Sequence, residues 1–387
     1  MSLSRVPRQV WAIAAGGALL DAGIGMILAI WPIHLTETLG ASVFVVGLIE
    51  GIGDGITALM IFLGGLLSDR LGRRRLVMLA GEGLGALSRL GYALGAASLP
   101  ALIGVRLVDR FGRSAVGAPR NALVGEAQDE TQGKALGYGA LYGVIALGAG
   151  AGPLVTGFIV AAGGDFATVA WVTVPLGLVG WAFYFLARDV GTKTPAAGPG
   201  DRSLGDWRLL GPIIALGCLM NVAAVGWAFV LLKGRSVGLT EQSVAYLFGA
   251  LCLTQGGAGL LGGRYAEALT TRGALVLGGL GMAATNILLA FATDAAAAAA
   301  AALLWGASWG VFNAVGTGLM FQAAAPARRA AAFGTISFLH TLPLFVSGPL
   351  YGWLIDAAGM SYAFGFGALF ALGVAATARL TIPSAWQ

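Results

Sequence analysis

The sequence is poor in charged residues, cysteine and histidine, and each scarcity excludes a class of protein. Charged residues make up 11% of the 387 residues, whereas soluble domains carry about 25%. The chain is therefore not a soluble globular domain. Its two cysteines, Cys218 and Cys252, both lie in apolar stretches and give no disulfide or metal spacing. With two histidines and no Cys/His cluster, we expect no metal, no cofactor and no enzyme activity.

What the chain has in abundance is apolar residues and glycine. Hydrophobic residues make up 57% of the sequence, the mean hydropathy is +0.83, and there are 63 glycines. Helices in lipid associate through close backbone contact at small residues, so the glycines suit a helical membrane protein. A β-barrel would instead show short alternating segments. We predict an all-α polytopic membrane protein.

Apolar runs long enough to cross a hydrocarbon core of about 30 Å define the spans. There are twelve of them, at approximately 10–33, 43–67, 76–97, 100–123, 135–161, 167–187, 209–232, 243–263, 274–293, 295–322, 331–356 and 361–380. The segment from Gly191 to Arg208 is the only long polar stretch, and it divides the spans six and six. We predict a bundle at 1–190, a cytoplasmic linker at 191–208 and a second bundle at 209–387.

The two halves are repeats of one another. Gly17 to Asp21 matches Gly217 to Asn221, and Gly152-Pro153 matches Gly348-Pro349, with offsets between 196 and 200 residues. Parallel repeats of this kind place a substrate site between the halves, near the middle of the membrane.

Basic residues in the short loops predict the orientation of the chain. With the amino terminus in the cytoplasm, sixteen basic residues at loops and helix ends lie inside and only Lys233 and Arg235 lie outside. This bias explains the pI of about 9.5 without any nucleic-acid partner. Residues 1–8 lead straight into the first span, so we expect no cleaved signal, both termini in the cytoplasm and a location in the bacterial inner membrane.

The fourth span is charged at its centre. Arg106, Arg110 and Arg113 recur at helical spacing and form one stripe. Each arginine at the bilayer centre costs roughly 2.5–3.5 kcal/mol on insertion scales, so the stripe must face protein or water. Two interpretations remain open: a network of ion pairs with acids of neighbouring helices, or an anion-binding wall of a transport cavity.

The second repeat offers aromatic residues at the same places. With Gly117 aligned on Gly316, the three arginines fall on Trp305, Trp309 and Phe312. We therefore count these aromatic residues, together with Asn221, as candidate substrate-binding residues opposite the arginines.

Two motifs resemble those of a known family. The loop between the second and third spans reads Gly64-Gly-Leu-Leu-Ser-Asp69-Arg70-Leu-Gly72-Arg73-Arg74-Arg75. The fifth span contains Gly148-Ala-Gly-Ala-Gly152-Pro153-Leu-Val-Thr-Gly157. With the six-plus-six repeat, the chain resembles the major facilitator superfamily, in particular its drug/proton antiporters. The resemblance implies a twelve-helix fold, with a gating role for the loop residues Asp69, Arg70, Gly72 and Arg73 and for the Gly152-Pro153 pair. In the fourth span Arg113 and Gly117 match the commoner family form, whereas Arg106, Asp109 and Arg110 are additional.

Proton coupling requires a titratable group at membrane depth. The candidates are Asp21, Glu50, Asp54, Asp109 and His340. Asp21 and Asp54 are the strongest candidates for proton coupling because each lies well inside its span. His340 fits a hydrogen-bonded core histidine better than a proton carrier.

The leading hypothesis is a monomeric transporter that exports an amphipathic, anionic organic compound by proton antiport. Its partners are then a small-molecule substrate, protons and the lipid bilayer. The alternative is uptake or exchange of a small organic or phosphorylated anion bound directly by the arginines. A transporter-like sensor or scaffold is a third possibility.

Overall fold

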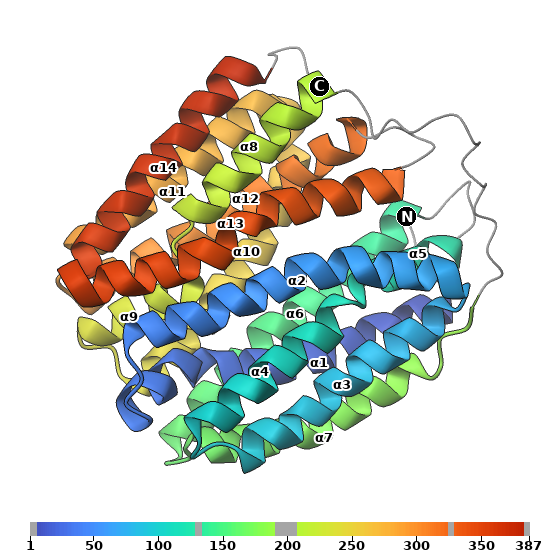
Figure 1. Ribbon diagram of the computed structural model, residues 1–387, viewed down its shortest axis with the longest axis horizontal. Coiled ribbons are helices and arrows are strands. Elements are labelled where there is room, and N and C mark those ends of the chain that lie inside the picture. Colours follow the sequence, from blue (N-terminus) through green and yellow to red (C-terminus); the bar gives the residue numbers. More distant parts are fainter. Residues whose placement is uncertain (1–5, 128–133, 190–206, 324–328, 383–387) are drawn as a thin grey trace.

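The computed structural model describes residues 6–127, 134–189, 207–323 and 329–382, and the described chain consists of helices joined by short connections (Figure 1). In order, the elements are α1 (Arg8–Ile33), a π-helical turn η2 (His34–Thr38), α2 (Val43–Leu71), α3 (Arg74–Leu94), α4 (Leu99–Ser114), α5 (Gly117–Glu126), α6 (Lys134–Ala161), α7 (Phe166–Tyr184), α8 (Trp207–Ala223), α9 (Trp227–Ser236), α10 (Glu241–Leu269), α11 (Thr271–Phe291), α12 (Ala295–Ala323), α13 (Arg329–Ala358) and α14 (Met360–Thr381).

Ten stretches of the described chain are long and apolar enough to cross a membrane. The third and fourth predicted spans, α3 and α4–α5, are not among them because they carry the charges. Helix α3 nevertheless points leucines such as Leu87 and Leu94 outward, 57% and 70% exposed, while Glu82 and Arg89 are buried. An apolar outer face with charges turned inward suits a helix that meets lipid on one side. The all-helical, multi-pass membrane fold predicted from the sequence is confirmed.

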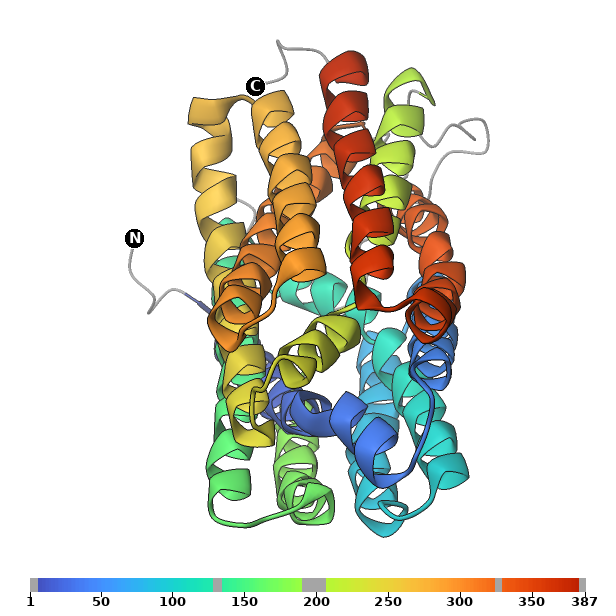
Figure 2. The same ribbon diagram turned by 90° about the vertical axis from the view of Figure 1, so that its left-hand side faces the viewer.

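Helices α1 to α7 contact one another, and so do helices α8 to α14. The two groups meet mainly through α2 against α13 and α6 against α10 (Figures 1 and 2). Glycine permits the tightest contact: a methyl group added at Gly47 would lie 2.2 Å from the Gly348 carbonyl oxygen. Near the other end of α2 the helices are further apart, since a methyl group at Gly334 would lie 3.9 Å from Phe62.

The fourth predicted span differs from expectation because it is broken in two. Helix α4 ends at Ser114 and α5 begins at Gly117. Pro119 explains the break: it has no N–H to donate to the carbonyl of Ala115, four residues earlier, and its ring crowds that carbonyl. The break is also where α2 comes close, since a methyl group at Gly64 would lie 2.3 Å from the Ala115 carbonyl oxygen.

The seventh predicted span, 209–232, is likewise broken, between α8 and α9. Two carbonyls at the end of α8 accept hydrogen bonds from side chains of other helices. Val222 accepts from the Tyr351 hydroxyl at 2.7 Å, and Ala223 accepts from Asn286 Nδ2 at 2.8 Å. Backbone groups released inside a membrane need such partners, so these two side chains make the interruption possible.

Candidate functional site

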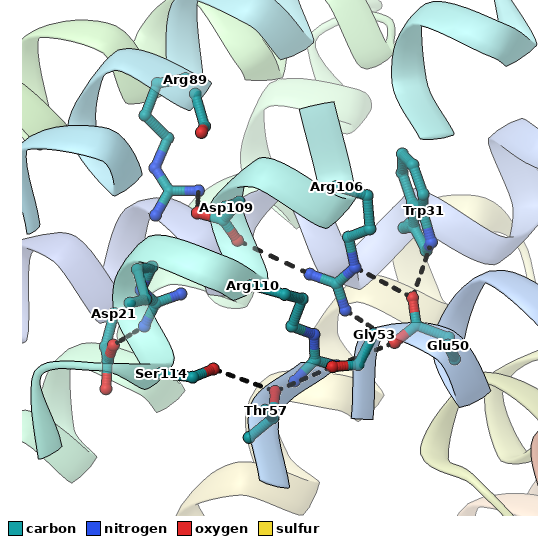
Figure 3. Close-up of polar contacts among 12 residues, drawn as sticks. Asp21, Trp31, Glu50, Gly53, Thr57, Arg89, Arg106, Asp109, Arg110 and Ser114 are labelled. Carbon is teal, nitrogen blue, oxygen red and sulfur yellow. Dashed lines mark hydrogen bonds and ion pairs between the residues drawn. The ribbon is translucent and has the colours of Figure 1, made fainter. Parts of the chain in front are cut away.

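Charged side chains from α1, α2, α3 and α4 gather in one polar cluster (Figure 3). Arg106 is almost fully buried in it, at 1% exposed. Arg106 donates from Nε and Nη2 to the two oxygens of Glu50, at 3.1 and 2.7 Å. Trp31 donates its indole N–H to the same carboxylate at 3.1 Å, and the Arg106 guanidinium lies 5.9 Å from the Trp31 ring centre. Glu50 and Arg106 therefore form a well-satisfied internal ion pair.

Arg110 lies one turn further along α4 and reaches the open side of the cluster. Its Nη2 donates to Glu50 at 3.0 Å and lies 3.3 Å from Asp54. The side chains of Arg110 and Asp54 are 22% and 27% exposed, so this pair retains access to solvent. Gly53 makes the arrangement possible, because a methyl group there would lie 3.3 Å from Arg110 Cγ.

Arg113 pairs with a different helix from the one that binds Arg106 and Arg110. It donates to Asp21 of α1, and the two side chains are 22% and 25% exposed. A methyl group at Gly85 of α3 would lie 2.7 Å from Arg113 Cγ, so that glycine gives the arginine its room. The fourth span thus holds two partly open pairs, Arg110–Asp54 and Arg113–Asp21.

Asp109 of α4 is almost fully buried, at 1% exposed. It is 3.6 Å from Arg89 and 3.9 Å from Arg106. Arg89 also donates to the Leu20 carbonyl at 3.3 Å. All three arginines of the stripe are ion-paired and all three also border open space, with Arg110 and Arg113 the more exposed. Both interpretations of the stripe stay predictions.

That open space is a pocket of the first half. It is lined by the arginines of α4, by Asp109 and by Ile24, Leu28 and Ser114. Ser114 donates to Thr57 at 3.0 Å, and Thr57 donates to the Gly53 carbonyl at 3.0 Å. Trp31, Thr57 and Ser114 are not among the residues predicted from the sequence. Of the three, only Ser114 had a sequence signal, namely its helical spacing from the arginines.

A second pocket lies in the second half, among α8, α11, α12 and α13. It is lined by three of the candidate substrate-binding residues, Trp309, Phe312 and Asn221, and by the proton-coupling candidate His340. Trp305 does not line it: this residue is 6% exposed and stacks on Trp309, with ring centres 5.7 Å apart and planes at 21°. The pocket-lining residues carry no carboxylate, so His340 shares the pocket with apolar, amide and hydroxyl side chains rather than acids.

The predicted gating loop turns at Gly72, which ends α2 with φ 59° and donates its N–H to the Ser68 carbonyl at 3.1 Å. Only glycine adopts this conformation readily. Arg70 and Arg73 are exposed. The side chain of Asp69 lies outside the described residues, so the gating role predicted for it stays a prediction.

The Gly152-Pro153 pair lies inside the first half. A methyl group at Gly152 would lie 2.1 Å from the Ala22 carbonyl oxygen, and one at Gly25 would lie 3.0 Å from Pro153 Cδ. The pair thus packs α6 tightly against α1, next to Asp21.

At the end where the two halves meet most closely, two polar contacts join them. Arg235, at the end of α9, donates to both oxygens of Glu37 at 2.7 and 2.9 Å. Asp356 of α13 accepts from the backbone N–H groups of Val43 and Phe44 at 3.3 and 2.8 Å. Asp356 thereby caps the start of α2, a favourable place for a carboxylate.

Comparison with known proteins gives one family. A model of the Major Facilitator Superfamily matches residues 13–232. An uncharacterized MFS-type transporter of Methanocaldococcus jannaschii is 28% identical over 130 residues, which cover 34% of this chain and 32% of that relative. The match therefore spans about a third of the relative's length.

Solved structures of low sequence identity share the fold. A POT family transporter in complex with 5-aminolevulinic acid superposes with a TM-score of 0.82 at 12% identity, over 97% of this chain and 98% of the other. The nucleoside transporter NupG gives 0.77 at 13% identity, over 97% and 99%. The human organic anion transporter MFSD10 (TETRAN) gives 0.70 at 16% identity, over 98% and 100%.

Proposed function

Because the chain belongs to the Major Facilitator Superfamily, we propose that it is a monomeric, proton-coupled exporter of an amphipathic organic anion across the bacterial inner membrane. The observation that carries the proposal is the pocket beside α4, where Arg110 and Arg113 are each paired with a partly exposed carboxylate. A guanidinium presents N–H groups in a fork that matches a carboxylate or phosphate, so either arginine can exchange its internal partner for a substrate anion.

This exchange supplies a coupling mechanism. While Arg113 is bound to Asp21, and Arg110 to Asp54, the positive charge favours the ionised carboxyl group. When a substrate anion takes over the arginine, the carboxyl group loses that stabilisation and binds a proton more readily. Substrate and proton occupancy are then linked through a shared arginine, without a long-range relay.

The transport cycle we propose is a rocking of residues 1–190 against residues 209–387 about the central pockets, with 191–208 as the cytoplasmic linker. With both termini in the cytoplasm, the end closed by Glu37, Arg235 and Asp356 faces outward. The loop residues Asp69, Arg70, Gly72 and Arg73 would close the opposite end in the other state. Gly152 and Pro153 would transmit movement of α6 to the helix that carries Asp21.

The alternative function is uptake or exchange of a small organic or phosphorylated anion. The feature that favours it is that Arg110 and Arg113 lie on adjacent turns of one helix, where both can contact a single compact anion. Purified protein that is stabilised against heat by small hydrophilic anions alone, and not by amphipathic ones, would favour this alternative.

The test of coupling uses Asp21→Asn and Asp54→Asn separately in liposomes. A coupling residue should lose transport driven by a pH gradient while keeping exchange of substrate across the membrane at equal pH. Glu50→Gln is the matched comparison: it neutralises a carboxylate of the same cluster that is occupied by Arg106, and it should impair folding rather than coupling alone. If both aspartate variants keep pH-driven transport, the coupling assignment is wrong.

A further inference from the structure

The pocket of the second half differs chemically from the one beside α4. None of the side chains described as lining it is a carboxylate, a lysine or an arginine. The first-half pocket contains three arginines and an aspartate. A charged group placed in the second pocket would lose water without gaining an opposite charge, which is strongly unfavourable. The second pocket is therefore suited to an uncharged group.

Asn221 and His340, two of its polar side chains, form a donor and acceptor pair; the pocket is also lined by Asn313, Thr317 and Ser337. Asn221 Nδ2 donates to the His340 carbonyl at 2.8 Å and lies 3.2 Å from His340 Nδ1. Since only the amide nitrogen can donate to a carbonyl, the orientation of Asn221 is fixed, and Nδ1 of His340 acts as acceptor. The neutral ring then carries its proton on Nε2. Among the described residues the Asn221 side-chain oxygen has no hydrogen-bond partner, so this pair offers a ligand one acceptor, the Asn221 oxygen, and one donor, His340 Nε2.

The shape of the pocket is set by rings and glycines. Trp309 is held flat by its stacking on Trp305, and Phe312 lies one turn further along α12. A methyl group at Gly217 would lie 2.7 Å from His340 Cβ, so this glycine lets the histidine lie against α8. At Gly316 no atom lies within 4 Å of an added methyl group, although the residue is buried. Gly316 therefore borders the empty part of the pocket.

We propose that this pocket binds an uncharged aromatic or heteroaromatic group that carries a carboxamide-type edge. The ring would lie against Trp309, and the amide would bond to Asn221 and His340. The inference rests on the proposed function, because it describes the uncharged part of the amphipathic anion whose charge is bound at Arg110 and Arg113. A plain alkyl chain would leave the donor and acceptor unused.

Two probes separate the two parts: benzamide for the uncharged group and acetate for the charge. Each is titrated against the purified protein while the thermal unfolding midpoint is followed. We expect each to raise the midpoint, acetate through a charge-assisted contact with the arginines of α4. Arg110→Lys should weaken the acetate response and leave the benzamide response unchanged.

The decisive variant is Gly316→Val, which fills the pocket, with Gly318→Val as its control. Gly318 is on the same helix, is exposed, and also has no atom within 4 Å of an added methyl group. Gly316→Val should weaken the benzamide response by about tenfold or more, whereas Gly318→Val should keep it. If Gly316→Val does not fold, His340→Phe, which keeps a ring but removes the donor, should give the same loss.

The results discriminate between the two proposals. An equal benzamide response in Gly316→Val and the unmodified protein would overturn this inference, as would the absence of any benzamide response. An acetate response that is weakened in Arg110→Lys would still support the anion site in that case. A benzamide response lost in Gly316→Val, with no acetate response, would support this inference and contradict the anion site.

Discussion

At the scale of single residues, the arginines of α4 differ in how completely internal partners enclose their charge. Arg106 is enclosed by Glu50 and Trp31, whereas Arg110 and Arg113 are 22% exposed. Removing one partner of a buried ion pair costs about 3–5 kcal/mol, because the other charge stays buried and unpaired. We therefore predict that Arg106→Gln lowers the thermal unfolding midpoint strongly, and that Arg113→Gln has a much smaller effect.

The control for Arg106 is the double variant Arg106→Gln with Glu50→Gln. Removing both charges takes away the unpaired group, so the double variant should be more stable than the sum of the single changes implies. Additive losses measured by thermal unfolding would show that the pair is not the reason for the stability of this region.

Arg110 allows a test of geometry rather than of charge. Lysine keeps the positive charge but has no planar fork, so Arg110→Lys should weaken binding of a carboxylate substrate by about tenfold while the protein stays folded. Binding to the purified protein measures this. Unchanged affinity in the lysine variant would mean that Arg110 acts only as a charge, or does not contact the substrate.

At the scale of helices, the glycine pair at the end of α2 shows how close packing depends on single positions. A methyl group at Gly64 would meet the Ala115 carbonyl oxygen at 2.3 Å, whereas one at Gly65 would lie 3.5 Å from Ala118 Cβ, an ordinary contact. Overpacking costs about 1–3 kcal/mol. Gly64→Ala should therefore lower the thermal midpoint and Gly65→Ala should leave it nearly unchanged; equal effects would contradict the close contact between α2 and the α4–α5 break.

The helices and their breaks also show which parts of the fold could be predicted from the sequence. Hydropathy located the twelve spans, because a membrane requires long apolar helices. The α4–α5 break has a local sequence signal in Pro119, although the prediction ran one span through it. The α8–α9 break had none, since Tyr351 and Asn286 come from distant parts of the chain. Likewise, helical spacing found the arginine stripe, but which arginine is enclosed depends on Trp31 and Glu50, whose packing only the fold decides.

At the scale of the whole molecule, the two contacts that join the halves at one end bear on alternating access. The Glu37–Arg235 pair is exposed, so it contributes at most about 1 kcal/mol. Asp356 adds a second contact by capping α2 across the boundary between the halves. Contacts present in one state and absent in the other shift the population of states by their own free energy. Two weak contacts can hold this end closed without preventing it from opening.

We therefore predict that Asp356→Asn combined with Arg235→Gln increases the population in which this end is open. Spin labels at the exposed positions Thr38 and Tyr362, in opposite halves, report the distance after Cys218 and Cys252 are replaced by alanine.

Asp165→Asn is the matched control, because Asp165 caps α7 through Thr168 at 2.8 Å within one half. The combined variant should show a larger fraction of long distances and Asp165→Asn should not. High salt should act in the same direction on the unmodified protein by screening the exposed pair. Identical distance distributions in all three proteins would mean that these contacts do not govern the closure of this end.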